Sequence, residues 1–262
     1  MMSPDGSFSS PLAGFARGLP CRPWCPISWQ SGAPISNGHH ILLYSTGMPI
    51  IAVAGRKGGI GKSTIAGNLA AELTEKGWDV VAVDADPQHS LASWAAQGDG
   101  LLSRTVNKVK HGDADALRIK VRSLDKAANL IIIDTPPGMP ETTFQAALLA
   151  DLMLLPCGAS PLDLFALKEV LSLALRARAE RRSKKPRIRF VPSRVPANTN
   201  LGRGLSEALE KMGKKVLPPI GQRIAVAEAV ASGLTMMEYA PTSPGRTEFS
   251  ELASAVDKIL RR

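Results

Sequence analysis

Short apolar runs alternate with amphipathic stretches along most of the chain. Five runs are apolar at successive positions, as expected for strands that are buried on both faces of a sheet. They are Ile50–Ala54, Val80–Val83, Leu130–Ile133, Leu152–Pro156 and Ile188–Pro192. Helical spacing of apolar residues predicts helices from about residue 62, over Leu162–Arg182, Leu201–Met212 and Glu248–Leu260. This alternation predicts an α/β fold, with a mostly parallel twisted sheet flanked by helices on both faces.

Residues 1–47 differ in composition from the rest of the chain. Gly, Pro and Ser fill 20 of these 47 positions, and only Asp5, Arg17 and Arg22 are charged. Such a segment buries too little apolar surface to fold, so it is predicted to be a disordered extension. The alternative hypothesis is that Met48 is the natural start. Residues 48–262 are predicted to form a single domain.

Composition indicates which kind of partner and which cellular compartment to expect. The formal net charge of +9 favours a polyanionic partner such as nucleic acid, without identifying it. The three cysteines, Cys21, Cys25 and Cys157, suggest no disulfide framework and favour a reducing cytoplasm. A zinc site from the first two cysteines with His39 and His40 is disfavoured, because the spacing matches no standard site. No apolar run of about 18 residues predicts a membrane span, and no secretory signal is expected.

One glycine-rich motif follows the first predicted strand and opens a predicted helix. It reads Lys-Gly-Gly-Ile-Gly-Lys-Ser-Thr over Lys57–Thr64. Gly58, Gly59 and Gly61 allow backbone angles closed to other residues and let N–H groups approach phosphate oxygens. The positive end of the helix points at the same anion. The motif therefore predicts a phosphate-binding loop.

Two side chains of this loop have predicted roles of their own. Lys62 would supply a point charge to the β- and γ-phosphates, and the Ser63 hydroxyl would reach Mg²⁺. The predicted nucleotide-binding set of the loop also includes Gly58, Gly59, Ile60, Gly61 and Thr64.

The loop departs from the ordinary Gly-x-x-x-x-Gly-Lys-Ser/Thr pattern at one position. Arg56 stands where the first glycine belongs, and a second lysine, Lys57, precedes Lys62 by five residues. We expect Arg56 to point to solvent, with a phosphate or DNA contact as the alternative. A glycine-rich turn arising by chance is disfavoured, because a predicted strand and helix flank the motif.

Three aspartates follow the ends of two predicted strands. Asp84 and Asp86 follow one strand, and Asp134 follows another. Because ligands bind beyond the carboxyl ends of parallel strands, these side chains are expected to converge on the loop. One such aspartate alone is as often a helix cap or a turn residue. Three together favour a site for Mg²⁺, held partly through its waters.

These motifs resemble the deviant Walker A ATPases, the group that includes ParA, Soj, MinD and the nitrogenase iron protein. The resemblance covers about residues 48–262, and the short plasmid-partition ParA proteins are the most similar members. The segments that carry it, besides the double-lysine loop, are Asp84–Gln88, Asp134–Gly138, Pro156–Asp163, Ile220–Ala229 and Gly233–Glu238.

The resemblance implies roles for individual residues. Two subunits would sandwich ATP, with Lys57 reaching the phosphates of the partner, while Lys62 and Ser63 act within the subunit. Asp86 would orient the attacking water. The residues implied to arrange Mg²⁺, partly through water, are Asp84 and Asp134, and the adenine-contact candidates are Pro192 and Arg194.

The resemblance also implies a function. The protein would be a cytoplasmic, nucleoid-associated partition ATPase that hydrolyses ATP to ADP and phosphate. The ATP-bound homodimer would bind DNA without sequence preference. A ParB/ParG-like centromere-binding protein would stimulate a slow hydrolysis that switches it off. No membrane binding is expected, because the apolar positions of the C-terminal stretch fit a packed helix better than an amphipathic anchor.

A basic stretch ends the long helix predicted over Leu162–Arg182. Eight of the fourteen residues from Arg176 to Arg189 are basic, and Glu180 is the single acidic one. The stretch predicts a patch that grips DNA phosphates, and the alternative is a solvated face at a helix C-terminus. The candidates are Arg176, Arg178, Arg181, Arg182, Lys184, Lys185 and Arg187.

Other functions stay open from the sequence. A close variant is an ATPase that positions another cargo. A metabolic ligase of the dethiobiotin or cobyrinate synthase type is disfavoured, by Lys57 in the first case and by the lack of a glutaminase domain in the second. An iron–sulfur reductase is disfavoured because Cys157 is the one cysteine of the predicted domain, and a shared cluster needs two from each subunit.

Overall fold

The computed structural model of the chain describes residues 47–109, 113–124 and 127–262. The predicted extension over residues 1–47 therefore lies outside the described residues, apart from Gly47. The disfavoured zinc candidates lie outside them as well.

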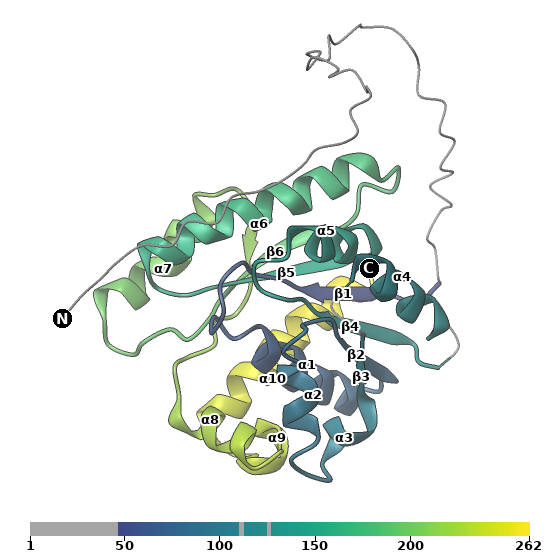
Figure 1. The fold of residues 1–262 in the computed structure, drawn as a ribbon. Coiled ribbons are helices and arrows are strands. Elements are labelled where there is room, and N and C mark those ends of the chain that lie inside the picture. The colour runs from purple at the N-terminus through teal and green to yellow at the C-terminus, as the bar shows by residue number, and fades with distance from the viewer. Residues whose placement is uncertain (1–46, 110–112, 125–126) are drawn as a thin grey trace, which may run out of the picture. The chain divides into compact units, whose positions relative to one another are not determined.

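Seven strands form one sheet with the order β3-β2-β4-β1-β5-β6-β7, and every pairing among the described strands is parallel (Figure 1). The strands are β1 (Ile50–Val53), β2 (Val80–Asp84), β3 (Val106–Lys108), β4 (Leu130–Asp134), β5 (Leu152–Cys157), β6 (Arg187–Pro192) and β7 (Lys215–Val216). The α/β fold with a parallel sheet is thereby confirmed. The five predicted strands are present. The edge strands β3 and β7 were not predicted, because they are short and partly exposed.

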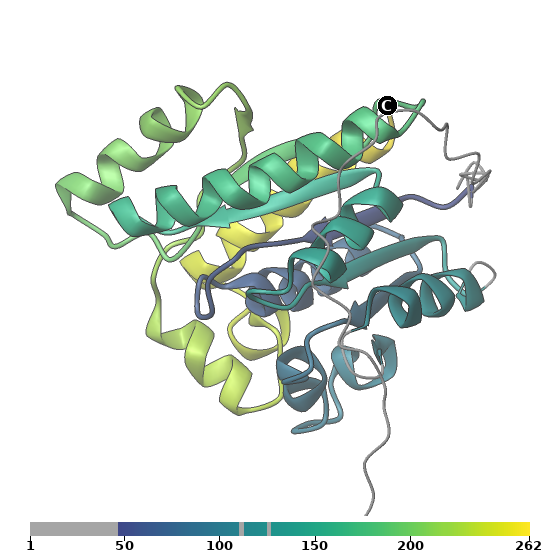
Figure 2. The ribbon, with the colours of Figure 1, turned by 45° about the horizontal axis from the view of Figure 1, so that its top comes forward.

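Helices cover both faces of the sheet. On one face lie α4 (Ala114–Ser123), α5 (Pro140–Leu149), α6 (Pro161–Glu180) and α7 (Asn200–Glu210). On the other lie α1 (Lys62–Glu75), α2 (Ser90–Ala95), α3 (Leu101–Thr105), α8 (Ile224–Ala231), α9 (Met236–Tyr239) and α10 (Pro244–Leu260). Figure 2 shows the two layers from a second direction. The alternating side chains of each strand feed two separate cores, one under each layer, which explains why the strands are apolar at successive positions.

Three helix predictions need correction at their ends. The helix predicted to end at Met212 ends at Glu210. The helix predicted to run to Arg182 ends at Glu180, because Arg181 already has extended backbone angles and Lys184 has a left-handed φ of 56°. The last helix begins at Pro244 rather than Glu248. Ser243 caps it by accepting a hydrogen bond from the Arg246 N–H at 3.2 Å, and proline is favoured at a first helical position.

The strand order decides which loops meet. β4 lies between β2 and β1, and its last residue, Asp134, is in register with Asp84 of β2 and Val53 of β1. We call the side of the sheet where the strands end its carboxyl edge, and the side where they begin its amino edge. The carboxyl edge therefore brings the glycine-rich loop after β1 and the aspartates after β2 and β4 together.

None of the helices in the described part of the chain combines the length and the apolar character needed to cross a membrane.

Candidate functional site

The glycine-rich loop turns the chain from β1 into α1. Gly59 and Gly61 have φ values of 74° and 91°, in the left-handed region that favours glycine, and Gly61 directly precedes α1. Gly58 does not need this freedom, since its φ lies outside that region and a Cβ there would meet nothing within 4 Å. The expectation that all three glycines adopt such angles is therefore wrong for Gly58.

Lys62 curls back over the loop that precedes it. Its side chain is buried, and its Nζ donates a hydrogen bond to the Lys57 carbonyl at 3.1 Å. Burial lowers the pKa of Lys62, while the negative charges of Asp134 and Asp86 raise it. The loop thus holds a cation in place beside two carboxylates.

The three aspartates meet at the carboxyl edge but are held differently. Asp84 is fully buried, and its two carboxylate oxygens accept hydrogen bonds from the N–H groups of Asp86 (3.0 Å) and Ala92 (2.9 Å). Asp86 accepts from the Gln88 N–H at 2.9 Å through one oxygen. Asp84 therefore fixes the loop after β2 and the start of α2, and Asp86 keeps its second oxygen unengaged within the described residues.

Asp134 is the unusual member of the group. It is fully buried, and neither carboxylate oxygen has a hydrogen-bond partner within the described residues. Burial raises the pKa of Asp134 to about 7. The Ser63 hydroxyl, near it without good hydrogen-bond geometry, and the Lys62 ammonium lower this pKa, whereas Asp84 raises it. An unpaired carboxylate beside a serine hydroxyl is a donor set that fits Mg²⁺.

These carboxylates form no complete metal cage of their own. Among the described residues, no group of three His, Cys, Asp or Glu side chains could hold a metal ion by itself. A site of this kind suits a cation that keeps several waters and takes its other ligands from a bound phosphate, as Mg²⁺ does.

Two basic residues at the start of the loop, Arg56 and Lys57, contact acidic residues of α6. Lys57 Nζ lies 2.8 Å from an Asp163 carboxylate oxygen, and Arg56 forms an ion pair with Glu169. Gly158 makes room for this arrangement, because a Cβ there would lie 2.5 Å from Asp163 Oδ2. Arg56 is exposed, as expected, and it also pairs with the exposed Glu169 of α6.

The segment after β6 also touches the loop. Arg194 Nη1 donates a hydrogen bond to the Gly59 carbonyl at 2.5 Å, and Ser193 Oγ donates to the Ile60 carbonyl at 2.7 Å. Pro192 ends β6 and is buried, with its carbonyl accepting from the Ile220 N–H. The structure places both adenine-contact candidates at the carboxyl edge, and Arg194 against the loop itself.

Residues 51–236 match the family model described as the CobQ/CobB/MinD/ParA nucleotide binding domain. The chain belongs to this family. The predicted resemblance to deviant Walker A ATPases is confirmed, and the protein is a ParA/MinD-family ATPase.

Two relatives of this ParA/MinD-family ATPase match over most of their own length. One is the maintenance of carboxysome distribution protein A of Halothiobacillus neapolitanus, which is 28% identical over 212 residues, 80% of this chain and 95% of the relative. The other is the chromosome-partitioning ATPase Soj of Thermus thermophilus, which is 32% identical over 239 residues, 79% of this chain and 94% of the relative.

A solved structure supports the same fold. The septum site-determining protein MinD of Pyrococcus horikoshii, complexed with Mg-ADP, superposes with a TM-score of 0.63 and is 21% identical. The superposition covers 81% of this chain and 97% of that one. At this identity the likeness shows the P-loop NTPase fold, and the complex illustrates that the family binds nucleotide with magnesium.

The basic stretch of this family member lies at the amino edge, and part of it is engaged within the protein. Arg181 donates to the Ala150 carbonyl, Lys185 Nζ lies 2.7 Å from an Asp151 carboxylate oxygen, and Arg187 donates to the Ile259 carbonyl at 2.6 Å. These contacts hold the chain between α6 and β6 against the beginning of β5 and the end of α10.

The other basic candidates divide into two groups. Arg176 lies 3.9 Å from the ring centre of Phe144 and pairs with Glu180 at 3.8 Å. Arg178 is half-buried, whereas Arg182 and Lys184 are exposed, and these three side chains have no hydrogen bond or ion pair within the described residues. Arg182 and Lys184 are therefore the most available cations of the stretch.

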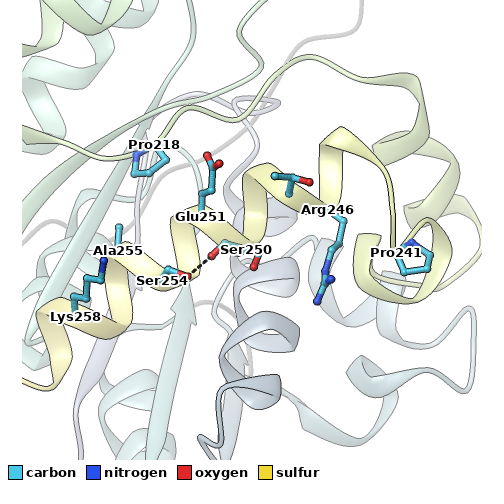
Figure 3. A pocket seen from close by; sticks show the side chains of 9 residues that line it. Pro218, Pro241, Arg246, Ser250, Glu251, Ser254, Ala255 and Lys258 are labelled. Atoms are coloured by element: carbon cyan, nitrogen blue, oxygen red, sulfur yellow. Dashed lines mark hydrogen bonds between the residues drawn. The ribbon is translucent and has the colours of Figure 1, made fainter.

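A groove of about 510 Å³ lies along α10, and Figure 3 shows side chains that line it. Polar and apolar residues both line it, and Arg246 at one end pairs with Glu72 (3.2 Å) and Glu75 (2.5 Å) of α1. The groove shares no lining residue with the loop, so it is not part of the candidate site.

Two contacts of the site were not foreseen from the sequence. Asp163 belongs to the segment Pro156–Asp163, which carries part of the family resemblance, but the sequence assigns it no role. Its one signal is its place in the first turn of α6. Ser193 carried no signal at all, because its partner Ile60 is 133 residues away in the chain.

Proposed function

We propose that the protein is a partition ATPase that dimerises on ATP, binds DNA without sequence preference and is released by hydrolysis. One observation carries the proposal: the phosphate loop, the buried Lys62 and the unpartnered Asp134 carboxylate converge at the carboxyl edge of a ParA/MinD-family sheet. A cation beside an unsatisfied buried carboxylate is suited to a triphosphate and a divalent metal arriving together.

In the proposed nucleotide site, the loop and the start of α1 bind the phosphates of the nucleotide. The N–H groups of the loop and of the first turn of α1 would bind phosphate oxygens, and Lys62 would add its charge. Ser63 and Asp134 are the residues that would hold Mg²⁺, which when bound neutralises phosphate charge. Asp84 would contribute mainly by fixing the loop after β2, because both of its oxygens already accept backbone hydrogen bonds.

Asp86 is proposed to orient the water that attacks ATP. In this step the water oxygen bonds to the γ-phosphorus, the bond to the ADP oxygen breaks, and ADP and phosphate leave. The unengaged oxygen of Asp86 can accept the hydrogen bond of such a water. Asp86→Ala should therefore still bind ATP and should accumulate as an ATP-bound dimer. Turnover at the wild-type rate in that variant would remove Asp86 from this role.

Lys57 is proposed to act across the dimer. A lysine from each subunit would offset the crowded charge of two triphosphates held face to face. In the single chain Lys57 is held by Asp163, so dimerisation would exchange a carboxylate partner for a phosphate.

The DNA-binding step is proposed for the exposed part of the basic stretch. Arg182 and Lys184 are free to meet phosphates, and contacts of this kind bind DNA without reading its sequence. The partner that stimulates hydrolysis is proposed to be a ParB/ParG-like centromere-binding protein, in a cytoplasmic and nucleoid-associated setting.

Retention on non-specific duplex DNA, measured with ATP, ADP and no nucleotide, tests the proposal. Retention should require ATP and should be lost in Lys62→Ala. Lys258→Ala, which removes an exposed lysine of α10, is the matched control. Retention that is indifferent to nucleotide would contradict the partition function and favour a metabolic enzyme.

A second candidate function is the positioning of a protein cargo. The similarity to a carboxysome distribution protein over 95% of that relative favours it. Both functions would use the same switch and would differ in the adaptor. Affinity capture on the ATP-bound Asp86→Ala variant distinguishes them, since a DNA-binding adaptor indicates partition and a cargo-shell adaptor indicates positioning.

A further inference from the structure

The phosphate loop is braced from outside by two adjacent residues. Ser193 Oγ donates to the Ile60 carbonyl at 2.7 Å, and Arg194 Nη1 donates to the Gly59 carbonyl at 2.5 Å. Ser193 sits directly against the loop, because a Cβ added to Gly61 would lie 2.7 Å from its hydroxyl oxygen. The contacts join segments more than 130 residues apart.

Holding these two carbonyls also sets the direction of two N–H groups. In a planar trans peptide, the C=O of one residue and the N–H of the next point in opposite directions. Fixing the Gly59 and Ile60 carbonyls toward the segment after β6 therefore aims the N–H groups of Ile60 and Gly61 the other way. Lys62 Nζ fixes the Lys57 carbonyl in the same way, and this contact therefore sets the direction of the Gly58 N–H group.

The aimed N–H groups are available to a ligand. Those of Gly58, Ile60 and Gly61 donate to no acceptor within the described residues. Successive N–H groups that converge in a loop form an anion-binding concavity. The bracing therefore determines whether the loop presents donors or carbonyl oxygens to a phosphate.

The brace itself is rigidly mounted. Ser193 is 1% exposed, and its N–H donates to the Cys157 carbonyl at 2.8 Å. Arg194 has a left-handed φ of 51°, a conformation that residues other than glycine rarely adopt. Val195 then pairs with Gly221 in an isolated parallel bridge. The strained arginine is thus held on both sides, and its side chain returns to the loop.

We propose that Ser193 and Arg194 are positioning residues that orient the phosphate-loop N–H groups toward the β-phosphate of a nucleoside di- or triphosphate. This inference rests on the proposed nucleotide site. It differs from an adenine contact by Arg194, because the brace acts on the phosphates and not on the base.

Calorimetric titration of ADP, ATP, GTP and AMP into the full chain tests the inference. Ser193→Ala should weaken ADP and ATP binding about 10-fold, because it leaves the Ile60 carbonyl unpaired and the loop free to turn. Ser193→Thr keeps the hydroxyl and should restore affinity. AMP affinity and the ratio of ATP to GTP affinity should stay unchanged, a pattern that a general loss of stability would not produce.

Arg194→Gln provides a second variant that does not disturb a buried position. Loss of its hydrogen bond to Gly59 should weaken ADP binding about threefold. Arg203→Gln, which removes an exposed arginine of α7, is the control for the lost charge. Wild-type ADP affinity in both Ser193→Ala and Arg194→Gln would overturn the brace. A changed ATP to GTP ratio in Arg194→Gln would instead assign that residue to the base.

Failure of the two proposals can be told apart. If the wild-type chain binds neither ADP nor ATP, the proposed nucleotide site is wrong, and so is the positioning role of Ser193 and Arg194. If the wild type binds and the variants bind equally well, the nucleotide site stands and the brace alone is wrong.

Discussion

The two edges of the sheet hold their charged residues in opposite ways. At the carboxyl edge, Lys62 and Asp134 are buried beside each other, and the carboxylate has no hydrogen-bond partner within the described residues. At the amino edge, Arg181, Lys185 and Arg187 are satisfied by carbonyls and a carboxylate of their own chain. A charge that the fold leaves unsatisfied in a buried place indicates a ligand, whereas a run of charges on a surface does not.

The comparison also shows that the position of a charged residue in the sequence does not decide whether its side chain is available to a ligand. Residues of the carboxyl edge occur where strands end, so the backbone itself brings them together. Residues of the basic stretch are neighbours in sequence, but each side chain takes whichever partner the nearby elements offer. The stretch therefore serves two roles, with some residues closing the fold and others facing solvent.

The largest expected effect comes from removing the buried cation. Lys62→Ala should weaken ATP binding by at least about 100-fold, since a charge-assisted contact with the phosphates is lost in a buried site. Isothermal titration with ATP and Mg²⁺ measures it, with Lys258→Ala as the control. ATP affinity equal to that of the wild type would show that the unsatisfied edge does not bind triphosphate.

Asp134→Asn should change how stability depends on pH. The folded-state pKa of about 7 lies above the ordinary 3.8, so wild-type stability is fully present below the ordinary value and declines as pH rises through 7. The advantage of the variant should be near zero at about pH 4 and reach a few kcal/mol at about pH 8. Denaturant unfolding of the nucleotide-free protein across this range measures it.

A comparison of the wild type and Asp134→Asn with ligand bound provides the control. With saturating ADP and Mg²⁺ the order should reverse, because the metal needs the ionised carboxylate that the variant lacks. A stability difference that does not vary with pH would mean that Asp134 is not held protonated by burial.

Two double variants test whether the basic residues of the amino edge have two separate roles. Arg182→Gln with Lys184→Gln should leave stability unchanged and make the slope of log binding constant against log salt less negative by about 2 for DNA. Arg181→Gln with Lys185→Gln should instead lower the free energy of unfolding by about 1 kcal/mol, because internal hydrogen bonds are lost. DNA retention across a salt series and urea unfolding measure the two effects. Equal behaviour of both pairs would erase the distinction.

The smallest expected effect concerns the ion pair between Lys57 and Asp163. Asp163→Asn frees Lys57 for a phosphate, and since exposed ion pairs contribute up to about 1 kcal/mol, ATP-dependent dimerisation should strengthen by no more than fivefold. Sedimentation analysis with a slowly hydrolysed ATP analogue measures it. Glu169→Gln, which removes the partner of Arg56, is the control. Weaker dimerisation in Asp163→Asn would mean that Asp163 supports the dimer instead of opposing it.

The sequence alone determined the fold class and the centre of the site. Buried parallel strands need apolar residues at successive positions, and a phosphate turn needs glycine at Gly59 and Gly61, so both leave a local pattern. Aspartates at strand ends are informative for the same reason, because parallel strands finish at one edge. The sequence by itself therefore predicts that Asp84, Asp86 and Asp134 converge at one edge of the sheet.

Only the tertiary structure decided which partners the side chains take. Lys57 meets Asp163 across 106 residues of chain, and Ile60 meets Ser193 across 133. It also decided that Asp84 is engaged while Asp134 is not, and that the basic stretch is divided. Contacts of this kind depend on how separate helices and loops pack together, and no periodicity or spacing within one segment encodes that packing.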